Sequence, residues 1–264
     1  MNRMKSKTLF VSFLVPVIFL VSCGGGETKK KSRTGSDEAL MAYPIPTALE
    51  ITQMLNKAGA AYIISVTNDV NNVSRYGTTR AKALNLGVYS ADLSYAATYN
   101  MQQDMMTFLN AVKLLMEQLE INTPLSQTLT EKLSKLEENK DSAMITITES
   151  IKDTYNYLKS NGKEDVALLV MAGGFIEGLY LTVQMAETSP DNTELLKVVS
   201  SQKNVFNKLY ELIEPYKDDE SLKDVYHDFI DLDSFFSKVS GTITQDQLNE
   251  IAQLAEKIRN NIIY

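Results

Sequence analysis

Residues 166–186 read VALLVMAGGFIEGLYLTVQMA, and this stretch decides the fold that the sequence predicts. The run is long and almost wholly apolar, so it predicts one helix over about 165–187. Its length would suffice to span a membrane, but Glu177 and Gln184 interrupt it and two acidic residues come just before it. We therefore expect a central helix that other helices bury on most sides.

Helical periodicity recurs on both sides of this stretch, from about residue 47 to the end, and strand signals are almost absent. The expected helices cover 47–59, 80–99, 101–120, Thr123–Pro124 to Leu136, Asp141 to Asn161–Gly162, 165–187, Ser189–Pro190 to Glu214, 219–239, and a last one that Thr244 and Gln247 open as a capping box. Eight or nine helices with short connections predict an all-α fold for residues 43–264. It is either a multi-helix bundle or a helical-repeat-like stack.

The N-terminus, residues 1–23, reads MNRMKSKTLFVSFLVPVIFLVSC and has the layout of a secretory signal peptide. A basic start precedes an apolar run that is short for a membrane span and that Pro16 interrupts. Leu20-Val21-Ser22-Cys23 resembles a lipobox, the motif after which bacterial lipoproteins are cleaved and acylated at the cysteine. We therefore predict a lipoprotein signal peptide over 1–22 and lipidation of Cys23, the single cysteine of the chain. An ordinary signal peptide with an incidental cysteine is the alternative.

The segment after the cysteine predicts a tether and a location. Residues 24–40, GGGETKKKSRTGSDEAL, are rich in Gly, Ser and Lys, so we assign residues 23–42 to the lipidated Cys23 and a flexible tether. Several acyl chains together would give durable membrane anchoring. Gly24, not an acidic residue, directly follows the cysteine, which in a Gram-negative cell favours the outer membrane, on either its periplasmic face or the cell surface.

The charge of the chain argues against nucleic-acid partners. The formal net charge is -7, from 26 basic and 33 acidic side chains. Three of the basic residues lie in the predicted signal peptide, so the mature body is more acidic still. An acidic body repels phosphate backbones and anionic lipid alike, and it also keeps a protein soluble.

Two helical stripes carry polar residues that could form a ligand pocket. On the 80–99 helix, Tyr89, Asp92 and Tyr99 share one stripe with Tyr95 nearby, and on the 165–187 helix the stripe comprises Gly173, Glu177, Tyr180 and Gln184. If the stripes face each other, they line a Tyr-rich pocket for a small polar ligand, and the two carboxylates provide an acid–base pair. Alternatively, neighbouring hydroxyls satisfy both acids, or the acids lie at the edge of the bundle.

The remaining candidates for chemistry are weak. Asp224, His227, Asp228 and Asp231 share one side of a helix at offsets suited to a cation, but this side lies opposite an apolar stripe. We expect a solvated acidic face there and no metal site. No cofactor is predicted, because the chain has no phosphate-binding Gly loop, and a Cys–His nucleophile is excluded if Cys23 is acylated.

Two mature segments, YPIPTALEI at 43–51 and ALNLGVYSADLSY at 83–95, together with the lipobox, resemble an uncharacterised family of Bacteroidetes lipoproteins. The resemblance implies an exported, lipid-anchored helical protein and supplies no catalytic residues. We expect a non-enzymatic binding or scaffold module that presents a helical surface or small pocket to a protein or a small polar ligand. The alternatives are a periplasmic enzyme that uses Asp92 and Glu177, and a structural spacer in the envelope.

Overall fold

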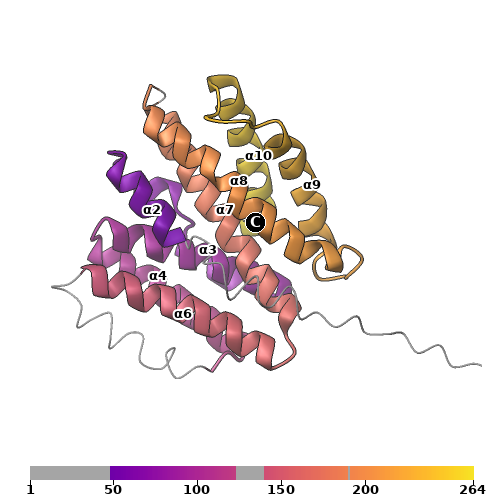
Figure 1. The fold of residues 1–264 in the computed structure, drawn as a ribbon. Helices are drawn as coiled ribbons and strands as arrows, with labels where there is room; N and C mark the ends of the chain where they lie inside the picture. The colour runs from indigo at the N-terminus through magenta and orange to yellow at the C-terminus, as the bar shows by residue number, and fades with distance from the viewer. Residues whose placement is uncertain (1–47, 123–139, 190) are drawn as a thin grey trace, which may run out of the picture.

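The computed structural model describes residues 48–122, 140–189 and 191–264 (Figure 1). These residues form an all-α multi-helix bundle, as predicted, and contain no strand. The α-helices are α2 (Ala48–Lys57), α3 (Thr79–Thr98), α4 (Gln102–Gln118), α6 (Lys140–Ser160), α7 (Glu164–Glu187), α8 (Thr193–Ile213), α9 (Lys223–Ser237) and α10 (Gln245–Ile263). Three short 3-10 helices accompany them: η1 (Ile64–Val66), η2 (Val70–Arg75) and η3 (Glu214–Tyr216).

The bundle is built around the crossing of α3 and α7, which share its most extensive contact. Glycines allow the two backbones to touch. A Cβ atom on Gly87 would overlap the carbonyl oxygen of Val170, and one on Gly173 would overlap the carbonyl oxygen of Leu84. Only a residue without a side chain fits at these two points. Most of α3 and α7 is therefore buried all round, which explains why neither helix has a clear polar face.

The other helices cover this central pair from two sides. Helices α2, α4 and α6 pack against α3, and α8 and α10 pack against α7. Helix α9 lies outermost, against α8 and α10 (Figure 1). The apolar stripes of α8, α9 and α10 are narrow because each of these helices has solvent on one side.

Helix α7 is the one helix of the described residues that is long and apolar enough to cross a membrane. In the bundle, 78% of its most apolar window is buried against other helices. The prediction of a central buried helix is thus confirmed, and the apolar surface of α7 is accounted for by packing.

Several predicted helix ends are confirmed by the capping geometry. Thr244 and Gln247 form the expected capping box at the start of α10. Gly162, just after α6, has a φ of 72°, the left-handed conformation that favours glycine at a helix end. Residues 60–78, which lie between the first two predicted helices, contain η1 and η2.

Other predicted ends were wrong by a few residues. Helix α8 begins at Thr193 and not at Ser189, because the side chain of Asn192 accepts hydrogen bonds from the first free N–H groups of the helix. Helix α6 already includes Lys140, so Asp141 lies inside the helix rather than at its cap. The helix predicted from Thr123–Pro124 to Leu136, the signal peptide, Cys23 and the tether lie outside the described residues.

Candidate functional site

The two polar stripes do meet, on one face of the α3–α7 crossing. Asp92 on α3 and Glu177 on α7 are both fully buried, with 0% of each side chain exposed. Burial is the largest cause that raises the pKa of Asp92, and the negative charge of nearby Glu177 raises it further. Arg259 of α10 completes the group, which we name the buried ionic cluster: Asp92, Glu177 and Arg259.

Glu177 is held by Arg259 in a two-pronged ion pair. Nε of Arg259 donates to Oε2 of Glu177 at 2.6 Å, and Nη2 donates to Oε1 at 2.8 Å. Nη2 also donates to the carbonyl oxygen of Val66 at 3.2 Å, and the Tyr180 ring lies 4.2 Å from the guanidinium carbon. Burial alone would lower the pKa of Arg259, but the charge and hydrogen bonds of Glu177 outweigh it and raise that pKa. Arg259 therefore stays charged inside the bundle.

Asp92 is the member of the cluster without a cation of its own. Burial is the largest cause that raises its pKa, followed by the charge of Glu177; the charge of Arg259 and the backbone N–H of Asn68 oppose the shift. That N–H donates to Oδ2 of Asp92 at 3.1 Å. The raised pKa favours a protonated, neutral Asp92, whose other oxygen, Oδ1, is buried without a hydrogen-bond partner among the described residues. The cluster then holds one negative and one positive charge, so no net charge is buried.

The predicted tyrosines of α3 bind the segment that joins α2 to α3. Each hydroxyl forms a 2.9 Å hydrogen bond to the backbone of that segment: Tyr89 to the carbonyl of Asp69, Tyr99 to the carbonyl of Ala60, and Tyr95 from the N–H of Ile63. Burial raises the pKa of Tyr95 to about 12, which keeps its hydroxyl protonated. These hydrogen bonds hold residues 60–69 against the α3–α7 crossing.

The two remaining predicted residues lie further out. Tyr180 is half-buried and covers the guanidinium of Arg259 with its ring. Gln184 donates to Oε2 of Glu187 at 2.8 Å at the surface of α7 and does not reach the cluster. Of the seven predicted pocket residues, Gln184 is therefore the one that does not lie with the others.

Sequence reasoning missed Arg259, although the sequence contains a signal for it. On α10, Arg259 lies four residues after Ala255 and three before Ile262, both of which are buried on the core-facing side. An arginine inside such an apolar stripe needs a buried partner. Asn68, which supplies the N–H to Asp92, has no such signal because it lies in a segment without periodicity.

The Tyr-rich pocket stays a prediction, and in this structure its two carboxylates are closed off from solvent. Asp92 and Glu177 are 0% exposed and Arg259 is 6% exposed, so the cluster is sealed. A polar ligand or substrate would have to displace hydrogen bonds that already connect α3, α7, α10 and residues 60–69. In this structure the buried ionic cluster links the helices to one another and is not accessible to a reacting molecule.

The acidic side of α9 forms ion pairs at the surface. Asp224 lies 3.5 Å from Arg80, and Asp231 lies 3.1 Å from Lys257. Burial raises the pKa of Asp228. Across residues 48–122, 140–189 and 191–264, no group of three or more His, Cys, Asp and Glu side chains is arranged to hold a metal ion.

Comparison with known proteins adds no relatives. No family model matches the chain. No curated protein and no solved structure matches it either. The resemblance to Bacteroidetes lipoproteins therefore stays a prediction, and function must be argued from the residues themselves.

Proposed function

We propose that this chain is a lipid-anchored lipoprotein of the bacterial cell envelope that acts as a non-enzymatic binding or scaffold module. The observation that carries the proposal is the N-terminal pattern, in which Leu20-Val21-Ser22-Cys23 closes a basic and then apolar segment. Acyl chains on Cys23 would anchor the protein, and residues 24–42 would join the anchor to the helical body. Gly24 after the cysteine favours the outer membrane.

The interior of the body supports a binding or scaffold role over catalysis. The acids that an enzyme would use, Asp92 and Glu177, are sealed and bonded to protein groups. A general acid or base has to come within hydrogen-bonding distance of its substrate. The enzyme alternative therefore requires an opening of the bundle at α10, whereas a binding module needs only a stable shape.

Metabolic labelling tests the anchor. The full chain is expressed in a Gram-negative host with a palmitate analogue, and the N-terminal peptide is identified by mass spectrometry. We expect cleavage before Cys23 and acyl groups on it, with the protein in the outer-membrane fraction. Cys23→Ser should abolish the label, and Ser22→Ala, which keeps a small residue before the cysteine, should retain it. An unacylated Cys23 with residues 1–22 still attached would refute the proposal.

A substitution of Glu177 tests the enzyme alternative. Glu177→Gln keeps the shape of the side chain and removes its charge. A catalytic role predicts that an envelope activity disappears while the fold, followed by circular dichroism, is preserved. Our proposal predicts the opposite result. The variant should be less stable, because the carboxylate serves to pair Arg259, and the envelope activities of the host should not change.

A further inference from the structure

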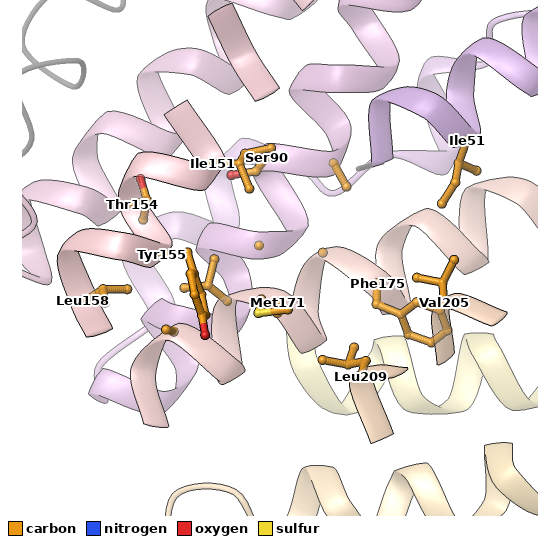
Figure 2. Close-up of a pocket in the computed structure, with 15 residues that line it drawn as sticks. Ile51, Ser90, Ile151, Thr154, Tyr155, Leu158, Met171, Phe175, Val205 and Leu209 are labelled. Atoms are coloured by element: carbon orange, nitrogen blue, oxygen red, sulfur yellow. The ribbon is translucent and has the colours of Figure 1, made fainter. Parts of the chain in front are cut away.

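The second face of the α3–α7 crossing holds an apolar cavity of about 110 Å³ between α2, α3, α6, α7 and α8 (Figure 2). Leu158, Met171 and Phe175 are among the side chains that line it, and no Asp, Glu, Lys, Arg or His is in the lining. The hydroxyl of Ser90, which also lines it, donates to the carbonyl of Leu86 in its own helix at 2.6 Å. Water needs several polar partners in a cavity, so this one favours an apolar occupant.

The wall of the cavity includes a glycine that the helix crossing does not need. The three atoms nearest to a Cβ on Gly174 would all belong to Gly87, and the closest, its carbonyl oxygen, would lie 3.4 Å away at an ordinary contact distance. At Gly87 and Gly173, by contrast, a Cβ would overlap backbone atoms. Glycine is less favourable than alanine inside a helix. The missing methyl group at Gly174 therefore leaves room in the cavity instead of relieving a clash.

The cavity opens between α6 and α7, next to a positive charge. Tyr155 of α6 and Val170 and Met171 of α7 line the cavity and are half-buried, so it reaches the surface there. One turn along α6, the ammonium of Lys159 lies 6.0 Å from the centre of the Tyr155 ring. An apolar chamber with a cation at its mouth complements a molecule that has a hydrocarbon tail and an anionic head.

We propose that this cavity binds the tail of a medium-chain fatty acid and that Lys159 binds its carboxylate. A cavity of about 150 Å³ lined by aliphatic and aromatic side chains takes up benzene, so the present volume holds roughly four tail carbons. The rest of a medium-length chain would pass Tyr155, whose ring lies beside the ammonium of Lys159. A two-chain lipid fits less well, because only one of its tails could enter and the other would stay in water.

Photolabelling tests the tail site. Cells that express the full chain receive decanoic acid with a diazirine near its tail end, and the residues labelled on irradiation are located by mass spectrometry. We expect labels on cavity residues of α6 and α7, such as Leu158 and Met171. Labels spread over the surface of the bundle, or confined to residues outside the cavity lining, would overturn the proposal.

Two matched glycine substitutions make the test specific. Gly174→Ala fills the space of one methylene, so the concentration of probe needed for half-maximal labelling should rise about fourfold. Gly178→Ala, one turn further along α7, lies outside the cavity lining, and its Cβ would meet only Cδ1 of Ile51 at 3.8 Å. It should leave labelling unchanged. Equal labelling of the Gly174→Ala chain and the unchanged chain would refute a tail in this cavity.

Competition tests the head group. Unlabelled decanoate should suppress labelling at a lower concentration than decanol, which has the same chain without the charge. Lys159→Met should bring the two competitors to the same potency, whereas Lys152→Met, at an exposed position of the same helix, should not. Equal potency in the unchanged chain would overturn the role of Lys159. Because none of this requires acylation, a Cys23→Ser chain should be labelled at the same residues, which separates this proposal from the lipoprotein proposal.

Discussion

The two faces of the α3–α7 crossing differ in what fills them. On one face the buried ionic cluster fills the interior with charged and polar side chains, and on the other the apolar cavity leaves about 110 Å³ between side chains. On α7, Phe175 lines the cavity, and Glu177, two positions later and about 200° around the helix, pairs with Arg259. A buried charge has to be bonded to its partner, whereas apolar walls tolerate unfilled space. The face with the ionisable residues is therefore the closed one, and the face with room for a ligand is apolar.

On the polar face, replacement of Arg259 should lower the free energy of unfolding more than any other change proposed here. Arg259→Met keeps much of the apolar stem but leaves Glu177 buried without a cation, which costs about 3 to 5 kcal/mol. Urea denaturation followed by circular dichroism measures the change. Lys257→Met, two residues earlier on α10, removes an exposed ion pair to Asp231 and should cost under about 1 kcal/mol. Similar losses in the two variants would mean that the cluster contributes no more than a surface pair.

The crossing that both faces share should be the next most sensitive point. Gly173→Ala places a methyl group against the backbone of Leu84, so α3 and α7 must move apart, at a cost of about 2 to 3 kcal/mol. Gly178→Ala makes the same change where the added Cβ has an ordinary contact, and it should be neutral or stabilising. The comparison is again made by urea denaturation. A neutral Gly173→Ala would show that the backbones are not in contact at this point.

Much of the fold was predictable because local rules agree with the tertiary structure. The capping box of Thr244 and Gln247 and the glycine stop at Gly162 are local signals, and both are confirmed. The apolar run of 166–186 predicted a buried helix because Glu177 and Gln184 interrupt it and two acidic residues precede it, and α7 is indeed mostly buried. The start of α8 was missed because Ser189 and Asn192 are both good caps, and only the packing selects Asn192.

The candidate site was predictable only in part. Helical spacing placed Asp92 and Glu177 on stripes that turn out to meet, but spacing carries no information about a third helix. The partner Arg259 lies 82 residues from Glu177 in the chain, and the N–H for Asp92 comes from an irregular segment. The cavity had no sequence signal, because its walls use the same apolar residues as a closed core. Contacts between segments distant in the sequence therefore determine whether these residues line a pocket or link the helices.

On the polar face, the protonation of Asp92 should make the stability of the protein depend on pH. Because the pKa of Asp92 is raised in the folded chain, the folded state binds more protons than the unfolded state above about pH 4, and stability falls as pH rises through the folded pKa. Asp92→Asn replaces the acid by a neutral donor and should remove this loss. We expect equal stability near pH 4, within about 1 kcal/mol, and a widening advantage of the variant toward pH 7.

Urea titrations of both chains between pH 4 and 8 measure this difference, in which groups common to the two chains cancel. Each unit by which the folded pKa exceeds the unfolded one gives about 1.4 kcal/mol. Glu177→Gln serves as the contrast, since it leaves Arg259 unpaired and should lower stability throughout the range. A constant difference between Asp92→Asn and the unchanged chain would mean that Asp92 is ionised in the fold.

The smallest effect should come from the apolar face, and its sign should be opposite to that of Arg259→Met and of Gly173→Ala. Gly174→Ala adds a methyl group that enters the cavity with an ordinary contact to Gly87 and favours the helix. The free energy of unfolding should therefore rise by about 0.5 to 1 kcal/mol. Every disturbance of the ionic pair or of the glycine crossing is expected to destabilise, so a stabilising change one residue from Gly173 would show that the room beside Gly174 is not required for folding. A destabilised Gly174→Ala chain would mean instead that the helices already fill this space, and the cavity would then have no volume to offer a ligand.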